Sequence, residues 1–280
     1  IRHKTKKRIF RVLTHTGVVD VSEDHSLLNS KNEIIKPNKC KIGETELLQS
    51  YPKNNINPIK LKNIVDKIYD KTDDLSLEQK EAFVYGFFYG DGSCGKYNCP
   101  SGLKYSWAIN NQDRFLLTKL KNYLEEIYKN KIPKLKGFKI LETMKSSGVY
   151  KLVPIGAIKP MVNIFRPIFY NKNKFKIIPN KILNGTYEQR LYFLIGYYGA
   201  DGFKCFKTKS KNIILTNKGK IGSAHLYYLM YSLGYKTSLN IRNDKPNIYK
   251  LGNTVGKFKK IDNKIKKIIY LRSADENEYI

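Results

Sequence analysis

The sequence lacks an apolar run long enough to cross a membrane, and it is short of acidic residues. Its longest apolar stretch, Phe83–Gly90, falls far below the ~20 residues that a spanning helix needs, so we expect no membrane partner. The 280 residues include 24 Asp and Glu against 52 Lys and Arg, which gives a net charge of +28. Such a charge attracts polyanions, and the basic residues alternate with Tyr and Ile in strand-like segments, which favours a nucleic-acid partner.

Cysteine and histidine are also scarce, at 4 residues each. The cysteines show no paired spacing typical of a zinc site. Cys94 and Cys99 could crosslink or share a metal, but spare thiols in a reducing, intracellular compartment are the better interpretation. The first residue is Ile1 rather than Met, so we expect that the chain was processed or excised from a longer one.

What the sequence does contain is one motif built twice. The stretches VYGFFYGDGS and LIGYYGADGF carry the aspartates Asp91 and Asp201, which lie 110 residues apart. With the same offset, the Ser-Leu-Glu-Gln that starts at Ser76 falls on the Thr-Tyr-Glu-Gln that starts at Thr186. Each is a capping box, which marks the start of a helix. The sequence therefore predicts two helices of equal length, each starting at the same cap and ending at the same aspartate.

Small residues recur four apart in both predicted helices, as Gly86 and Gly90 in the first and as Gly196 and Ala200 in the second. A glycine inside a helix costs about 1 kcal/mol relative to alanine, so these residues need a reason to be there. Small residues at this spacing leave a flat stripe on which another backbone can lie closely. We predict that the two stripes pack against each other; the alternative is that each packs on an unrelated element.

Close packing of these helices would bring Asp91 and Asp201 together at the helix C-termini. There, Gly92 and Gly202 are expected to end each helix in a left-handed turn. A carboxylate is unfavourable at the negative end of a helix, and two adjacent carboxylates repel. A bound cation would offset both effects, and oxygen ligands suit Mg²⁺ or Mn²⁺ better than zinc. The repeat thus predicts a metal site at a pseudo-twofold axis.

The segments that follow each helix repeat as well, in the order hairpin, helix, strands and lysine element. A lone Asp-Gly would carry no weight, but an ordered set of elements indicates a duplication. The matched segments are expected hairpins over 93–110 and 203–216, helices near 113–128 and 223–233, strands at Val149–Val153 and Ile248–Gly252, and lysine elements at Phe175–Ile182 and Phe258–Ile265.

This duplicated pattern resembles the LAGLIDADG homing endonucleases in their single-chain form with two motifs. The nine-residue signature maps on Val84–Gly92 and Leu194–Gly202, and an earlier acidic position is replaced by Tyr89 and Gly199. The resemblance implies an α/β (α+β) fold, in which two pseudosymmetric αββαββα halves lay saddle-shaped antiparallel sheets on double-stranded DNA. It also implies a monomer with pseudo-twofold symmetry.

The resemblance assigns the catalytic divalent metals to Asp91 and Asp201, with the backbone carbonyls of Gly90 and Ala200 as further metal ligands. The metal is expected to be Mg²⁺ or Mn²⁺.

Members of the family also place a lysine of each half near the site, often in a Lys-x-x-Pro element before the second motif. Lys176 matches this element, since a proline follows three residues later. Its repeat partner is Lys259, for which Lys257 and Lys260 are alternatives. By the resemblance these lysines assist catalysis through their charge or by tuning water.

The same resemblance places basic residues at alternate strand positions in the major groove. Phosphate contacts would supply most of the affinity, and only a few side chains would read base edges. The candidates for DNA binding are Lys96, Lys104, Lys204, Lys207, Lys209 and Arg242.

A second resemblance lies outside the nuclease. The stretch GVVDVSEDHSLLN, residues Gly17–Asn29, is similar to a conserved block of inteins in which Thr-x-x-His is usual, and here Ser22 precedes Glu-Asp-His25. Together with the preceding VLTHTG, it looks most like inteins of family B DNA polymerases. His25 would then correspond to the histidine that polarises the N-terminal scissile peptide. Because this chain opens with Ile1 and has no terminal His-Asn pair, we expect that it does not splice by itself.

These resemblances divide the chain into five expected segments. They are a partial β-rich intein (Hint) splicing domain over 1–50, a linker over 51–74, the LAGLIDADG subdomains over 75–184 and 185–267, and a return segment toward the splicing domain over 268–280.

The predicted function is metal-dependent cleavage of both strands of a long, asymmetric DNA target, namely the intein-less allele of a DNA polymerase gene. Three alternatives stay open: a nuclease that binds DNA without cutting it, an RNA-binding maturase, and a protein-splicing element whose nuclease is a passenger. Metal-dependent cutting separates the first function from the other three.

Overall fold

The computed structural model describes residues 6–48, 56–72, 74–202, 213–242, 244–245, 247–253 and 263–273. The first strand of the hairpin expected over 203–216 falls outside these ranges. Six of the predicted site residues do so as well: Lys204, Lys207, Lys209, Lys257, Lys259 and Lys260.

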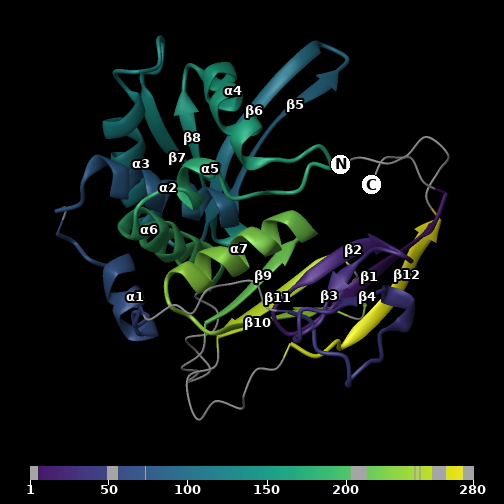
Figure 1. Ribbon diagram of the computed structural model, residues 1–280. Helices are drawn as coiled ribbons and strands as arrows, with labels where there is room; N and C mark the ends of the chain where they lie inside the picture. The colour runs from purple at the N-terminus through teal and green to yellow at the C-terminus, as the bar shows by residue number, and fades with distance from the viewer. Residues whose placement is uncertain are drawn as a thin grey trace.

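Helices and antiparallel sheets alternate along the chain, so the protein has a mixed α/β architecture (Figure 1). The helices are α1 (Leu61–Ile68), α2 (Leu77–Asp91), α3 (Arg114–Tyr128), α4 (Ile158–Phe169), α5 (Asn180–Leu183), α6 (Tyr187–Tyr197) and α7 (Lys220–Ser232). The strands are β1 (Arg8–Leu13), β2 (Val18–Ser22), β3 (Leu27–Leu28), β4 (Ile34–Ile35), β5 (Gly92–Cys99), β6 (Gly102–Asn111), β7 (Gly137–Met144), β8 (Val149–Ile155), β9 (Ile214–Lys218), β10 (Thr237–Ile241), β11 (Ile248–Asn253) and β12 (Lys267–Ser273). Among the described residues, no helix is both long and apolar enough to span a bilayer.

Helices α2 and α6 start at the predicted capping boxes. The Ser76 hydroxyl accepts the backbone N–H of Gln79, and the Gln79 side chain accepts the N–H of Ser76 in return. Thr186 and Gln189 form the same pair of hydrogen bonds at the start of α6. The capping box depends only on two residues three apart, so it could be predicted without knowing the tertiary contacts of the helix.

The two helices pack on each other through the predicted glycines. A Cβ on Gly86 would lie 1.9 Å from the carbonyl oxygen of Phe193, and a Cβ on Gly196 would lie 2.1 Å from that of Phe83. The two contacts are reciprocal, since the offset of 110 residues converts one pair into the other. The predicted packing of the two stripes is therefore confirmed, and it places a pseudo-twofold axis between the helices.

The ends of the two helices differ from the prediction. Gly92 is extended, with φ −80° and ψ 154°, so it does not form the expected left-handed turn, and the chain passes directly into β5. The second helix is not the equal of the first, because α6 ends at Tyr197 and continues as a π-helical turn over Tyr198–Gly202. This turn contains Gly199, whose low helix propensity favours such a departure.

Each half carries an antiparallel sheet. The first has the strand order β5-β6-β8-β7, and its inner face buries Trp107, Ile109 and Leu152 against α2, α3 and α4. The second has the order β10-β11-β9 among the described strands and packs on α7. The hairpin β5–β6 forms as predicted and projects from the body of the molecule (Figure 1).

The N-terminal strands β1 and β2 form a third sheet with β12, from the other end of the described chain, in the order β12-β1-β2. This sheet lies beside the second half (Figure 1). Residues from the two ends of the described chain pair here, with Phe10 opposite Tyr270. One face covers a small core of Val12, Val21 and Ile265.

The segment expected as a linker contains a packed helix. Ile64 and Ile68 of α1 are fully buried in the main core, and the Lys67 ammonium donates to the Tyr192 hydroxyl of α6 at 3.4 Å. A Cβ on Gly199 would lie 3.5 Å from Ile68. The segment expected as a linker is therefore a structural part of the main core.

Candidate metal and nucleic-acid site

The two motif aspartates stand at the C-terminal ends of the central helices. Asp91 is the last residue of α2, and Asp201 lies in the π-helical turn after α6. A Cβ on Gly90 would lie 2.6 Å from the Cβ of Ala200 and 3.2 Å from Oδ2 of Asp201. The second carboxylate therefore lies against the last turn of the first helix, as the close packing requires.

Asn111 contacts the first of these carboxylates, and the sequence reasoning missed it. Its Nδ2 donates to Oδ2 of Asp91 at 2.5 Å, while its Oδ1 accepts the backbone N–H of Asp113 at 2.7 Å. Asp113 caps α3, so the amide is fixed from both sides. In the sequence Asn111 directly follows the predicted hairpin over 93–110, and this position does not mark it as a partner of Asp91.

Lys176 reaches the same place from the segment between α4 and α5. Its ammonium donates to the backbone carbonyls at the end of α2, those of Phe88 at 3.0 Å and of Tyr89 and Gly90 at 2.9 Å each. Burial lowers the pKa of Lys176 to about 8, although the charges of Asp201 and Asp91 act in the opposite direction. Lys176 therefore lies near both aspartates, as predicted. Its ammonium also caps the C-terminal end of α2.

The donor set fits a divalent cation that prefers oxygen ligands. Asp91 and Asp201 supply two carboxylates, and within the described ranges no cluster of three or more His, Cys, Asp or Glu residues could hold a metal by itself. A cation here would therefore complete its shell with backbone carbonyls, water or phosphate, as Mg²⁺ commonly does. The carbonyl of Gly90, one of the predicted ligands, already accepts a hydrogen bond from Lys176 and keeps one lone pair.

One face of the first sheet is basic and polar. Cross-strand partners share a face, and the registers put Asn110 opposite Lys151, and Lys139 opposite Val153. Lys104, on the same face of β6, stands opposite Tyr97. None of the strand positions described on this face is acidic. Lys139 and Lys151 were not among the predicted DNA-binding residues.

Lys96 does not share this face. It pairs with Tyr105, and alternation along the strands puts it on the side of Cys94 and Trp107, which is the side covered by α4. Its ammonium lies over the Tyr105 ring at 5.7 Å. The register of the hairpin sends Lys96 and Lys104 to opposite sides of the sheet, so the two lysines do not share a face. Their roles in DNA binding stay predictions.

Two further predicted residues are exposed on other elements of the fold. Arg242 follows β10, where it is exposed and forms an ion pair with Asp244 at 2.6 Å. His25 is exposed in the turn after β2, and its backbone N–H donates to the carbonyl of Ser22 at 3.0 Å. Their roles in DNA binding and in splicing stay predictions.

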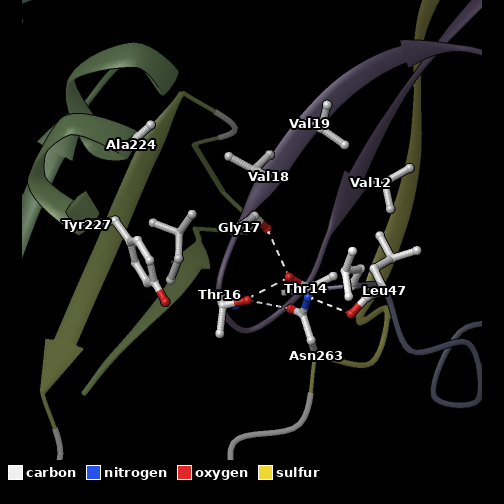
Figure 2. A pocket seen from close by; sticks show the side chains of 12 residues that line it. Val12, Thr14, Thr16, Gly17, Val18, Val19, Leu47, Ala224, Tyr227 and Asn263 are labelled. Atoms are coloured by element: carbon white, nitrogen blue, oxygen red, sulfur yellow. Dashed lines mark hydrogen bonds between the residues drawn. The ribbon is translucent and has the colours of Figure 1, made fainter. Parts of the chain in front are cut away.

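A pocket of about 290 Å³ opens between the N-terminal sheet and α7 (Figure 2). Thr16 donates to Asn263 Oδ1, and Asn263 Nδ2 donates to the Leu47 carbonyl at 2.9 Å. Tyr227 of α7 faces these groups from the other side. None of the predicted site residues that the structure describes lines this pocket, which is distinct from the aspartate site.

Comparison with known proteins gives a homologous sequence and a shared fold. No family model matches the chain. Over 271 residues, or 96% of its length, the chain is 49% identical to a DNA polymerase of Acanthamoeba polyphaga mimivirus, and it spans 14% of that protein.

Two solved structures of the homing endonuclease I-DmoI share the fold at 16% identity. A mesophilic variant matches with a TM-score of 0.50 over 64% of this chain and 90% of its own. The complex of I-DmoI with DNA and Ca also has a TM-score of 0.50, over 65% of this chain and 85% of its own. The protein therefore has a mixed α/β fold with antiparallel sheets, similar to that of the LAGLIDADG homing endonuclease I-DmoI.

Proposed function

We propose that the chain is a divalent-metal-dependent DNA endonuclease that cuts both strands of a long, asymmetric duplex. The observation that carries this proposal is the reciprocal glycine contact of α2 and α6, which packs the two helices so closely that Asp201 lies against Gly90. Carboxylates at helix C-termini are unfavourable by themselves, and a bound cation would offset both the helix dipole and the repulsion between them. The fold likeness to I-DmoI, which was solved with DNA and Ca, supports the same site.

In this proposal each residue of the site has a stated task. Asp91 and Asp201 would hold Mg²⁺ or Mn²⁺, with the carbonyls of Gly90 and Ala200 as further ligands. The bound metal supplies activation of water and neutralisation of charge on the phosphate. Asn111 fixes the orientation of the Asp91 carboxylate through its 2.5 Å hydrogen bond.

Lys176 keeps a positive charge beside both carboxylates, and its three carbonyl contacts hold the last turn of α2 in place. Lys259 would play the corresponding part in the second half. These lysines act through charge and position, so that losing one slows the reaction without ending it.

The polar face of the first sheet would carry the DNA. Lys104, Lys139 and Lys151 stand on this face and would contact phosphates, while Asn110 and Tyr97 are placed to meet base edges. The net charge of +28 adds a sequence-independent attraction to any duplex.

The target that this proposal favours is the uninterrupted allele of a DNA polymerase gene. Nearly the whole chain, 96% of it, matches 14% of a protein named as a DNA polymerase, which is consistent with an element inserted in such a gene. Residues 1–50 and β12 would then belong to a splicing domain, which the pairing of β1 with β12 supports because it brings together strands from both flanks of the nuclease. His25 would take part in splicing only in the full-length parent.

The experiment that tests this proposal is a digestion of a duplex library that contains the uninterrupted polymerase gene around candidate insertion points. Cutting at one site with Mg²⁺, and none with EDTA, is the expected result. Tight binding of duplex without cutting would indicate an inactive nuclease. A preference for structured RNA over duplex DNA would indicate a maturase. Either of the last two results would overturn the proposal.

A further inference from the structure

The two halves of the molecule each place an asparagine at the same point of the fold. Asn111 ends β6 two residues before Asp113, the N-cap of α3. Asn217, in β9, stands two residues before Gly219, the N-cap of α7. The repeated fold makes the two side chains structural counterparts, so one would expect each to serve the aspartate of its own half.

Only the first asparagine does so through the bonds described above. The amide of Asn217 points elsewhere: its Nδ2 donates to the Ser223 hydroxyl at 3.1 Å and to the carbonyls of Lys218 and Gly219 at 3.3 and 3.4 Å. Its Oδ1 accepts the hydroxyl of Tyr89 at 2.9 Å. Both ends of the Asn217 amide are therefore engaged in a network with Tyr89, Ser223 and backbone carbonyls.

Tyr89 is the residue that crosses from the first half to reach Asn217. It lies within the first motif, at the position where the second motif has Gly199. Its ring is held by Phe193 at 5.7 Å and by Tyr197 at 5.0 Å between centroids. Gly222 leaves room for its hydroxyl, since a Cβ there would lie 2.7 Å from that oxygen.

The backbone conformation at the two aspartates also differs between the two halves. Asp91 ends a regular α-helix and is partly buried, whereas Asp201 lies in a π-helical turn and is exposed. The first carboxylate is thus held by a regular helix and by an amide that is itself fixed, and the second is presented on a different backbone.

We propose that Asn111 and Tyr89 are positioning residues that make the two halves unequal: Asn111 orients Asp91, and Tyr89 keeps Asn217 engaged so that it does not orient Asp201. This inference rests on the proposed endonuclease function and deepens it. Its consequence is that the two DNA strands are nicked at different rates, and that the faster nick depends on Asn111.

The test compares two matched variants on a duplex labelled separately on each strand. Asn111→Ala removes the contact to Asp91, and loss of a group that orients a metal ligand typically costs about 10- to 100-fold in activity. We expect that slowing on one strand alone, the strand that the wild type nicks faster. Asn217→Ala, the counterpart substitution, is expected to leave the ratio of the two nicking rates unchanged.

Tyr89→Phe distinguishes the hydrogen bond of Tyr89 from the packing of its ring, because it removes only the hydroxyl that donates to Asn217. We expect the freed amide to turn toward Asp201 and the ratio of the strand rates to move toward one. A loss of folding would slow the nicking of both strands together. Thermal unfolding of all three variants shows whether such a loss contributes to the measured rates.

A readout in the metal-free protein does not depend on activity. The side-chain amide protons of Asn217 should exchange slowly with solvent in the wild type and faster in Tyr89→Phe, as followed by NMR of ¹⁵N-labelled protein, while those of Asn111 stay unchanged. Equal strand rates in the wild type, or slowing of the opposite strand by Asn217→Ala as strong as that by Asn111→Ala, would overturn the inference. Absence of any cutting would instead overturn the proposed function.

Discussion

Asp20 of β2 accepts hydrogen bonds from Arg11 in the neighbouring strand, at 2.8 Å, and from Lys220 at the start of α7, 200 residues away along the chain. Arg11 also lies over the ring of Tyr249 in β11 at 5.9 Å. This cluster joins the N-terminal sheet to the second half of the duplicated fold, through the buried Arg11 and Tyr249 and the partly buried Asp20 and Lys220.

The attachment should weaken in acid. Burial acts to raise the pKa of Asp20, but the bonds from Arg11 and Lys220 outweigh it, so the pKa lies below the usual value of 3.8. A carboxyl with a lowered folded-state pKa contributes stability above its unfolded pKa, and that stability is lost as the pH falls through the folded value. Urea unfolding at a series of pH values should therefore show a steeper loss of stability below about pH 4 in the wild type than in Asp20→Asn. An equal dependence of stability on pH in the wild type and in Asp20→Asn would contradict this role of Asp20.

Alanine at either central glycine should destabilise the protein. The new methyl of Gly196→Ala or Gly86→Ala would meet a backbone carbonyl at about 2 Å, and a backbone cannot turn aside as a long side chain can. Overpacking of this kind costs about 1–3 kcal/mol, and more where the clash is with main chain. Gly252→Ala is the matched control, because its nearest neighbour would lie 3.9 Å away. Denaturant melts of the three variants compare the effects.

Lysines on the polar face of the first sheet should control affinity for duplex DNA, and Lys96 should not. Each of Lys104→Ala, Lys139→Ala and Lys151→Ala is expected to reduce the slope of log Kd against log salt by about 0.9. Lys96→Ala, on the opposite face of the same hairpin, is the control and should leave the slope unchanged. Fluorescence anisotropy of a labelled duplex at several salt concentrations measures this slope. A slope change at Lys96 as large as that at Lys104 would show that the register-based assignment of faces is wrong.

Removing the Lys176 ammonium should affect both folding and cutting. In Lys176→Ala, the carbonyls of Tyr89 and Gly90 lose the ammonium as donor, while that of Phe88 keeps the N–H of Gly92. Leaving a buried acceptor unsatisfied costs about 1–3 kcal/mol. We expect lower stability together with slower cleavage of both strands, measured by melting and by single-turnover digestion. Lys172→Ala removes an exposed lysine four residues earlier and should change neither. Full cleavage activity in Lys176→Ala would contradict the proposed task of this lysine.

Much of the centre of the fold followed from local sequence. The capping boxes at Ser76 and Thr186, and the glycine stripes, depend on short spacings within one helix, so the sequence alone was enough to predict them. The predicted hairpin also formed, with Cys99 opposite Gly102 across its turn. Its register was not predicted, and that register decides which lysines face the same way.

The parts that the sequence did not reveal depend on contacts between distant segments. Gly92 was expected in a left-handed turn because the last carbonyls of α2 need donors. In the structure the Lys176 ammonium supplies them, and Gly92 is free to enter β5. Asn111 lies 20 residues from Asp91 along the chain, and nothing in its immediate sequence marks it as a partner of that carboxylate. The buried α1 within an expected linker was missed for the same reason.

The central claim is that Asp91 and Asp201 together form a metal-dependent cutting centre. The most direct test is the rate of double-strand cleavage by Asp91→Asn and Asp201→Asn on the duplex that the wild type cuts, with binding measured in parallel. Removing a ligand of a catalytic metal forfeits several kcal/mol of transition-state stabilisation, so each variant should cut the duplex at least about a thousandfold more slowly while binding it as the wild type does. If either variant cut both strands at the wild-type rate, the paired aspartates would not be the centre of the reaction.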